Sequence, residues 1–236
     1  AKASAARDED FIEYVHQANM HSTMMFFTEQ GRLYWTKVYE LPEGNRQSKG
    51  RALQNMINIQ KGDKVCAFIH VKNLNDMEYV QNHYLIFATK DGLMKKTTLE
   101  SYSRPRANGI IALGLREGDR LIRVTLTDGN SQMLVASYNG KVVRFPEDTV
   151  RPMGRTATGV RAIKLDEDGQ DRVIGMICVE EGSKESVLVI SEKGFGKRTD
   201  LDDENGEAIY RITNRGGKGV KTMNLTDKTG NLIGLE

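Results

Sequence analysis

The sequence predicts an all-β protein built from propeller-like blades, and three observations support this interpretation. One pattern occurs four times: a strand-forming run, a turn glycine, a basic strand, a polar loop, and a second glycine followed by an apolar residue. A further turn and strand follow each copy, which gives about four strands per repeat, the content of one propeller blade. The 23 glycines and four prolines suit many tight turns better than long helices.

The first half of each repeat is a predicted hairpin. Its copies read TMMFFTEQGRLYW (23–35), YLIFATKDGLMKK (84–96), QMLVASYNGKVVR (132–144) and SVLVISEKGFGKR (186–198). The turn glycines are Gly31, Gly92, Gly140 and Gly194, spaced by 61, 48 and 54 residues. In the first copy, alternation along the strand places Leu33 and Trp35 on one face and Tyr34 on the other.

The second half of each repeat is a polar loop that leads to another glycine. Its copies read RQSKGRAL (46–53), RPRANGIIAL (104–113), GRTATGVRAI (154–163) and NRGGKGVKTM (214–223). The second glycines are Gly50, Gly109, Gly159 and Gly219, which follow the turn glycines by 19, 17, 19 and 25 residues. The last gap is longer because the acidic stretch DLDDENGE (200–207) intervenes, and we expect a loop insertion there.

The repeats define a single domain over 1–236 that covers about four to five blades of roughly 50 residues. We expect the blades near 8–60, 61–117, 118–168 and 169–224, with the start of another blade at 225–236. The alternative is a pair of unrelated antiparallel sandwiches whose hairpins look alike, as hairpins often do. Three distinct elements in the same order in every copy favour the blades.

Composition indicates a globular chain without a membrane partner. With 236 residues, 39% of them hydrophobic, the chain can bury a substantial core. No apolar run approaches the roughly 20 residues that cross a bilayer, and no signal-peptide pattern opens the sequence. Cys66 and Cys178 lie in the strand-like runs VCAFI and MICVE. We expect reduced core thiols in a cytoplasmic protein, with a disulfide or metal pair as the alternative.

The net charge of +2 hides a strong segregation of charge. The segments from turn glycine to loop carry net charges of +3 (31–51), +4 (92–116), +4 (140–164) and +1 (194–221). These segments total +12, so the remaining residues carry −10, of which 165–193 contributes −5. Because equivalent parts of successive blades occupy equivalent positions, we expect one basic band around the edge of the disc.

A basic band on a curved edge favours a bent polyanion, and we expect double-stranded DNA held through its phosphates rather than its base edges. The backbone of a glycine-rich loop such as RGGKG can also approach a phosphate closely. The alternatives are a solvated charged face and a propeller that docks proteins on its acidic surface. The candidate DNA-binding residues are Arg46, Lys49, Arg51, Lys95, Lys96, Arg104, Arg106, Lys141, Arg144, Arg151, Arg155, Arg161, Lys197, Arg198, Arg211, Arg215, Gly216, Gly217, Lys218, Gly219 and Lys221.

The sequence contains no recognisable catalytic or metal-binding pattern. GGKGVKT (216–222) is like a phosphate-binding P-loop only in part, because Val220 follows Gly219 where that motif has lysine. The four histidines show no metal-ligand spacing with one another or with the cysteines. We therefore expect a non-enzymatic chain that holds no cofactor and no metal.

The residues also carry a family resemblance over essentially the whole chain. The stretch from DEDFIEY to LQNMI (8–57) resembles the first blade in the C-terminal domain of the DNA gyrase A protein, most closely of the Bacteroidetes kind. Later blades of that family resemble SYSRPRANGIIAL (101–113), VRPMGRTATGVRAI (150–163), GFGKRTDL (194–201) and YRITNRGGKGVKTMNLT (210–226). The resemblance implies a β-pinwheel, six-bladed in the family, in which each blade exchanges a strand with its neighbour.

The resemblance further implies that the basic perimeter wraps DNA in positive crossings, so that the whole enzyme introduces negative supercoils. The catalytic tyrosine and the ATPase would lie outside this chain, in an A2B2 assembly that uses ATP and Mg and acts on the bacterial nucleoid. NRGGKG (214–219) resembles the family's QRRGGKG box, but it lies in the fourth repeat and not the first, and Asn214 replaces the start of the box. The same-class alternative is the C-terminal domain of the topoisomerase IV C protein.

Overall fold

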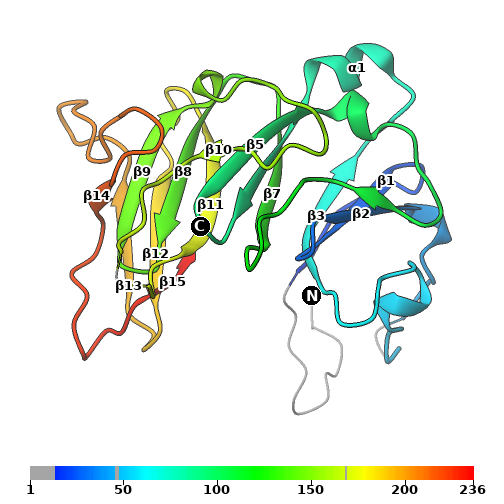
Figure 1. Cartoon of the computed structure of the whole chain (residues 1–236), viewed down its shortest axis with the longest axis horizontal. Coiled ribbons are helices and arrows are strands. Elements are labelled where there is room, and N and C mark those ends of the chain that lie inside the picture. The colour runs from blue at the N-terminus through cyan, green and yellow to red at the C-terminus, as the bar shows by residue number, and fades with distance from the viewer. Residues whose placement is uncertain (1–13, 46–47, 168) are drawn as a thin grey trace.

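The computed structural model describes residues 14–45, 48–167 and 169–236. Almost all of its regular structure is β (Figure 1), together with the short helix α1 (Met77–Asn82). Four 3-10 turns complete the described elements: Val38–Glu40, Leu53–Asn55, Leu99–Tyr102 and Glu147–Thr149. Within these ranges, no helix has the length and apolar character that crossing a membrane requires.

Four antiparallel sheets follow one another along the chain, from blue through green to red in Figure 1. The first contains β3 (Val65–Val71), β1 (Thr23–Thr28), β2 (Arg32–Lys37) and β6 (Ile110–Ile111), in that order. The second contains β10 (Val160–Arg161), β5 (Leu93–Thr98), β4 (Tyr84–Thr89) and β7 (Leu121–Thr127). The third contains β11 (Val173–Glu180), β8 (Ser131–Ser137), β9 (Lys141–Pro146) and β14 (Val220–Lys221). The fourth contains β13 (Gly196–Asp200), β12 (Ser186–Ser191) and β15 (Leu232–Leu235).

Each of the first three sheets takes its last strand from the next repeat. Strand β6 of the second repeat pairs with β2, β10 of the third pairs with β5, and β14 of the fourth pairs with β9. This exchange is the arrangement of a β-pinwheel and confirms the expected fold class.

The expected blade boundaries are wrong in one respect. The strands placed at the start of a new blade, β3, β7 and β11, complete the sheets that precede them, so cuts at 61, 118 and 169 divide each sheet. The segment 225–236 opens no further blade, because β15 pairs with β12 and completes the fourth sheet. The sequence shows the period of the repeat, but long-range pairing decides which strands share a sheet.

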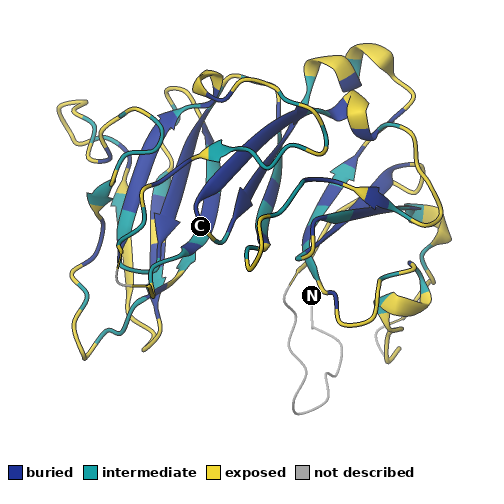
Figure 2. Cartoon of the chain, viewed as in Figure 1, coloured by how far each residue is buried: buried dark blue, intermediate teal, exposed yellow. Residues whose placement is uncertain are grey.

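Side-chain alternation explains why the hairpin strands read as continuous apolar runs. On β4, Leu85 and Phe87 pack in a cluster with residues of the first sheet, while Ile86 and Ala88 pack in a cluster with residues of the third. The strand is therefore buried on both faces, and Figure 2 shows burial running along the strands with exposed turns at their ends. On β2, Leu33 and Trp35 share the cluster between the first two sheets and Tyr34 faces away, as the alternation predicts.

The strands β3, β7, β11 and β15 contact one another in sequence and form the inner part of the molecule. The exchanged strands β6, β10 and β14 lie at the opposite end of each sheet. The loops that lead into the exchanged strands therefore lie at the outer edge, which is the geometry that a perimeter binding surface needs.

The second glycine of the second, third and fourth repeats marks the place where the exchanged strand meets its neighbour. Gly109 has a φ of +65°, and a Cβ built there would lie 2.6 Å from the Leu33 carbonyl oxygen. At the same position of the first repeat, Gly50 has a φ of +71° with no atom within 4 Å of such a Cβ. The two glycines thus share a left-handed backbone conformation, but only Gly109 lies close against the backbone of a neighbouring strand.

We expect Gly109→Ala to destabilise the protein by about 3 kcal/mol or more, because the new methyl group meets a fixed carbonyl and the left-handed conformation is strained as well. Gly50→Ala introduces only the backbone strain, about 1 kcal/mol. Urea unfolding of both variants measures the difference. Equal losses of unfolding free energy in the two variants would show that the close contact with the Leu33 carbonyl does not restrict position 109 to glycine.

Candidate nucleic-acid interface

The basic loops of the second, third and fourth repeats are hydrogen-bonded into one row. The Gly114 N–H donates to the Ala157 carbonyl (3.2 Å), which joins the loop of the second repeat to that of the third. The Lys164 N–H donates to the Gly217 carbonyl (2.8 Å), which joins the third to the fourth. In both bonds the donor is the fifth residue after the second glycine of its own repeat. The acceptor is the second residue before the second glycine of the following repeat, so the same junction occurs twice.

Two further hydrogen bonds strengthen the junction between the third and fourth repeats. The Gly216 N–H donates to the Ala162 carbonyl (2.8 Å), and a guanidinium nitrogen of Arg215 donates to the Arg161 carbonyl (2.6 Å). The RGGKG loop therefore lies against the exchanged strand of the preceding repeat. The Arg215 guanidinium of the fourth repeat thus meets the backbone of Arg161 in the third repeat.

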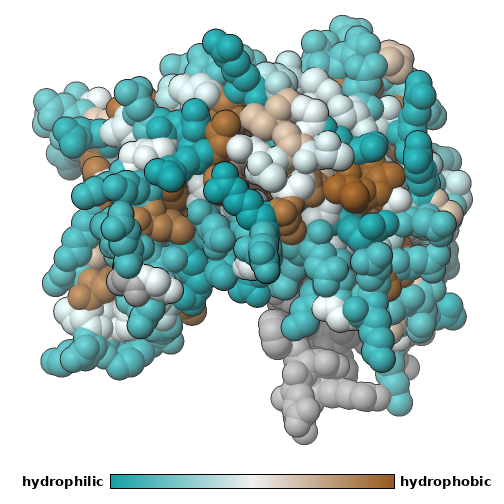
Figure 3. Space-filling view, viewed as in Figure 1, coloured by the Kyte–Doolittle hydropathy of each residue, from teal (hydrophilic) through white to brown (hydrophobic). Residues whose placement is uncertain are grey.

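Most of the expected DNA-binding residues reach the surface along these loops and strands. Figure 3 shows hydrophilic residues over most of one face of the molecule. Exposed candidates are Lys49, Arg51, Arg104, Arg106, Arg151, Arg161, Lys197, Arg198, Arg211, Lys218 and Lys221. Partly exposed candidates are Lys141, Arg155, Arg215, Gly216, Gly217 and Gly219. Arg46 lies outside the described residues.

Two members of the row carry unpaired nitrogen atoms. Arg155 and Arg215 both stand four residues before a second glycine, and the Nε atom of each is buried without a hydrogen-bond partner among the described residues. Because both Nε atoms are buried, neither is available to a phosphate, and the partly exposed Arg155 and Arg215 would contact DNA only through the rest of their surface. Sequence reasoning missed Lys164 and Arg116, two exposed cations five and seven residues after a second glycine. Their position shortly after that glycine was the available signal.

The structure contradicts three of the expected contacts. Lys95 is 0% exposed, Lys96 is 4% exposed and Arg144 is 5% exposed, so DNA cannot reach them. Their strands are covered on both faces by neighbouring sheets, and side chains that alternate across such a strand reach solvent on neither face. Alignment of the repeats at the turn glycine gives the missed signal, because the residues equivalent to Lys96 and Lys95 are the packed Trp35 and the buried Tyr34.

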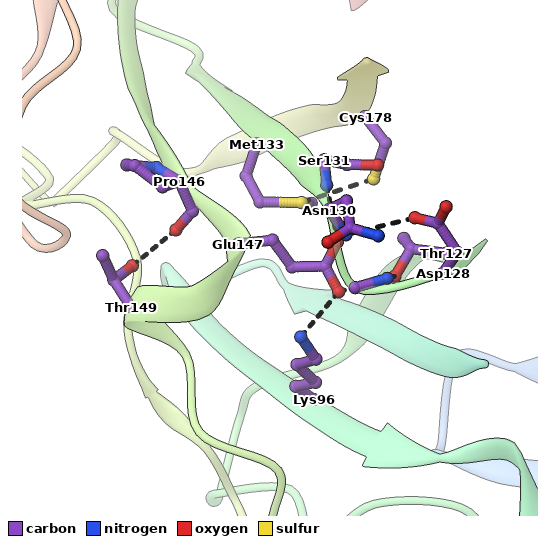
Figure 4. A network of polar contacts seen from close by, with 11 residues as sticks. Lys96, Thr127, Asp128, Asn130, Ser131, Met133, Pro146, Glu147, Thr149 and Cys178 are labelled. Carbon is purple, nitrogen blue, oxygen red and sulfur yellow. Dashed lines mark hydrogen bonds and ion pairs between the residues drawn. The ribbon is translucent and has the colours of Figure 1, made fainter. Parts of the chain in front are cut away.

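Lys96 forms a buried ion pair with the next repeat instead (Figure 4). Its Nζ lies 2.8 Å from a carboxylate oxygen of Glu147, with side-chain exposures of 5% and 0%. The Thr127 hydroxyl and the Ser131 N–H donate to the same carboxylate, at 2.6 and 3.2 Å. The network ties the second sheet to the third, because Lys96 and Thr127 belong to the second, Ser131 belongs to the third, and Glu147 directly follows β9 of the third.

Arg144 occupies the equivalent position in the third repeat and makes the equivalent connection. Its guanidinium donates to the carbonyls of Leu201 and Tyr210 and to the Asp202 carboxylate in the fourth repeat, all at 3.3–3.4 Å. In the first repeat, the Trp35 indole N–H donates to the Tyr102 carbonyl at 3.1 Å. The fourth residue after the turn glycine is therefore a donor between sheets in these three repeats.

Lys95 is buried without an acidic partner. Its Nζ donates to the Ala112 and Arg155 carbonyls, both at 2.5 Å, and to the Tyr102 hydroxyl at 3.2 Å. It also lies 4.6 Å from the centre of the Phe87 ring. Burial, and next the positive charge of Arg155, lower the pKa of Lys95 from 10.5 to about 7.

The lowered pKa of Lys95 predicts a pH-dependent stability. Between pH 7 and 10.5 the unfolded chain binds a proton that the folded chain has lost, so the free energy of unfolding rises with pH across this window. We expect the wild type to gain up to about 1.4 kcal/mol per pH unit relative to Lys95→Met between pH 7.5 and 9.5. Urea unfolding of both proteins at several pH values measures this difference, and parallel profiles would contradict it.

The row does not continue to the first repeat in the same form. A groove of about 560 Å³, lined by Arg51, Asn55 and Ala107 among others, lies where the next junction would be. Asn55 stands five residues after Gly50, and Ala107 stands two residues before Gly109. These are the positions that form the junction bonds between the later repeats, but here they line the groove. The first repeat thus presents Lys49 and Arg51 beside the row and not within it.

Neither cysteine forms a disulfide. Both thiols are mostly buried, and burial raises the pKa of Cys66 and of Cys178 to about 12. Each sulfur therefore stays protonated near neutral pH and acts as a core residue. Among the described residues, no group of three or more histidine, cysteine, aspartate or glutamate side chains is arranged to hold a metal ion.

These features define an antiparallel β-propeller with exchanged strands and a row of basic loops on its outer edge. A family model described as the DNA gyrase C-terminal domain, beta-propeller, matches residues 22–72, 83–128, 132–180 and 185–236. The chain belongs to the DNA gyrase C-terminal domain family. Each matched segment ends with the strand that completes its sheet, in agreement with the pairing in the structure.

The chain is also similar to known full-length proteins. It is 42% identical over 226 residues to the DNA gyrase A protein of Staphylococcus aureus (strain NCTC 8325 / PS 47), covering 96% of this chain and 24% of that protein. The same identity and coverage hold for the DNA gyrase A protein of Staphylococcus epidermidis. The chain therefore spans about a quarter of the length of these relatives.

Solved structures agree on the fold. The crystal structure of the C-terminal domain of DNA topoisomerase IV matches with a TM-score of 0.78 and 24% identity, covering 92% of this chain and 64% of that one. The structure of a DNA gyrase A C-terminal domain matches with a TM-score of 0.69 and 21% identity, covering 91% and 65%. At these identities the likeness concerns the fold alone.

Proposed function

We propose that the chain is the DNA-binding and DNA-wrapping domain of a gyrase A protein. Duplex DNA runs along the outer edge and bends as it passes from one basic loop to the next. The observation that carries the proposal is the row of loops, in which the same hydrogen-bonded junction joins the second, third and fourth repeats. Cations at equivalent positions of such a row contact phosphates at regular intervals, which favours a curved path.

The proposed contacts are the accessible members of the candidate set. They comprise the exposed cations of the loops and of the short exchanged strands, with Lys164 and Arg116 added and with Lys95, Lys96 and Arg144 withdrawn. Arg46 is retained from the sequence alone. The RGGKG backbone lies at the junction itself, where the Gly216 N–H donates to the Ala162 carbonyl.

In the whole enzyme, the wrapped segment would present a positive crossing for strand passage, which gives negative supercoils. The chain itself would perform no chemistry. The cleavage tyrosine, the ATPase and their ATP and Mg would belong to the remainder of the gyrase A protein and to the gyrase B protein in an A2B2 enzyme of the bacterial cytoplasm. Supercoiling of relaxed plasmid by the intact enzyme separates this proposal from a component of topoisomerase IV.

Binding to linear duplex DNA as a function of salt tests the proposal. If six or more phosphates are contacted, log K should fall with log salt with a slope of about −5 or steeper, and should vary little with sequence. Ligation of short DNA into small circles in the presence of the protein reports the bend, and the sign of the writhe trapped in those circles reports the handedness of the wrapped path. Absence of binding at low salt, combined with protein partners that persist after nuclease treatment, would favour a protein-docking propeller instead.

A further inference from the structure

Lys95 lies beneath a loop that carries two of the proposed DNA contacts. Residues 151–158, here called the Arg155 loop, lie on β5 of the preceding sheet. The loop is fastened at one end by the Met153 N–H, which donates to the Lys96 carbonyl at 2.8 Å. Near the other end, the Ala157 carbonyl accepts the Gly114 N–H at 3.2 Å. Between these two backbone bonds, the Lys95 Nζ holds the Arg155 carbonyl.

The Lys95 amino group connects three repeats at one point. Lys95 belongs to the second sheet, and Arg155 belongs to the third repeat. Its other carbonyl partner, Ala112, follows the exchanged strand β6, and the Ala112 N–H donates to the Gly31 carbonyl of the first repeat at 2.7 Å. A single buried amino group thus fixes the Arg155 loop relative to the two preceding repeats.

We propose that Lys95 is a positioning residue for DNA bending, which holds the Arg155 loop so that Arg151 and Arg155 continue the curve set by the preceding loops. The proposal rests on the DNA-wrapping function proposed above. Lys95 itself cannot contact DNA, because none of its surface is exposed. It acts through the backbone of the residue whose side chain faces the path.

The same device is present in the fourth repeat in an incomplete form. Lys197, the equivalent of Lys95, donates to the carbonyl of Thr222, which is the equivalent of Ala112, at 2.9 Å. The described residues supply no second carbonyl from another basic loop, and Lys197 is exposed. Lys197 therefore serves as a matched comparison at the same position of the repeat, with access to DNA in place of a loop to hold.

The hold on the loop changes with pH. The groups that face the Lys95 Nζ are the Phe87 ring from β4, the Tyr102 hydroxyl, the Ala112 carbonyl, and the carbonyl and guanidinium of Arg155. None of these groups is acidic, and the pKa of Lys95 is about 7. The neutral amine has two N–H groups, enough for the Ala112 and Arg155 carbonyls, and its burial avoids the desolvation cost of the ammonium, so the loop is held more firmly on the alkaline side of neutrality.

Lys95→Met and Lys197→Met test the proposal in DNA binding at pH 6.5 and 8.5. Lys95→Met should weaken binding about tenfold at pH 8.5 and less at pH 6.5, because at the lower pH the wild type itself bears the cost of a buried ammonium. Its salt slope should equal that of the wild type, since no phosphate contact is lost. Lys197→Met should instead reduce the salt slope by about 1 at both pH values.

Hydrogen exchange gives a readout that needs no DNA. At pH 8.5, the amides of Met153 and Ala157 in the Arg155 loop should exchange faster in Lys95→Met than in the wild type, while amides of the unrelated strand β12 keep their rates. If these amides exchange faster in Lys95→Met but the wild type does not bind DNA, the role of Lys95 in positioning the loop is upheld and the wrapping function is rejected. Unchanged exchange with an unchanged pH profile of binding would overturn the positioning role. A reduced salt slope for Lys95→Met would overturn it as well, by making Lys95 a phosphate contact.

Discussion

Lys96→Met is expected to lower the free energy of unfolding by about 3–5 kcal/mol. The substitution keeps most of the apolar stem but leaves the Glu147 carboxylate buried with only the Thr127 hydroxyl and the Ser131 N–H as donors. Glu147 is 1% exposed, so water cannot replace the lost ammonium. The loss exceeds that of an ordinary hydrogen bond because one charge of a buried pair remains without its partner.

Two further variants show whether the pair causes the loss. Lys96→Met combined with Glu147→Gln should recover most of the stability, because a neutral amide can still accept from Ser131 and donate to Thr127. Lys90→Met removes a partly exposed partner of Asp91, at 3.9 Å, and should change stability by less than about 0.5 kcal/mol. Urea unfolding measures all three. A double variant as unstable as Lys96→Met would mean that packing around the lysine, and not the stranded charge, is responsible.

The sequence was sufficient for the parts of the fold that depend on local chemistry. Turn glycines at 31, 92, 140 and 194 all have positive φ, as a hairpin turn there requires. The acidic stretch 200–207 lies almost wholly outside the strands, since β13 ends at Asp200. In both cases a few neighbouring residues determine the conformation, so the pattern could be interpreted without knowing the rest of the chain.

Strand exchange and blade boundaries could not be derived in the same way. The exchanged strands span two residues each, as at Ile110–Ile111, which is too short for a periodic signal. Their partners lie in another repeat, and a cyclic repeat can be divided at any point without changing its period. The family resemblance implied the exchange, but only the pairing of β15 with β12 showed that 225–236 completes a sheet.

The candidate site was predicted best where its cations occupy loops and least well where they occupy strands. A loop arginine such as Arg104 has no neighbouring sheet to cover it and is exposed. Lys96 has the same charge in a strand that packs on both faces, and the protein uses that charge to join two sheets. Position within the repeat, more than residue type, therefore decides whether a cation is available to DNA.

Reversing the charge of Arg104 and Arg106 together should weaken duplex DNA binding by about 100-fold near 0.1 M salt. Both side chains are exposed, and they stand five and three residues before Gly109, at the start of the row. Arg104→Glu with Arg106→Glu removes two phosphate contacts, so the salt slope should fall by about 2, and the new carboxylates repel the backbone. The fold should remain intact, because neither side chain makes a described hydrogen bond or ion pair and loop cations contribute little to a core.

A second double reversal controls for net charge. Lys184→Glu with Lys228→Glu changes the charge of the chain by the same amount at two exposed lysines outside the four basic segments. Long-range repulsion alone would weaken both double variants equally and would be screened at moderate salt. Direct contact along the row predicts instead that only the Arg104 and Arg106 variant loses slope and bending, measured by salt titration and by circle ligation. Equal behaviour of the two variants would remove the second repeat's loop from the DNA path and would leave the row without its first member.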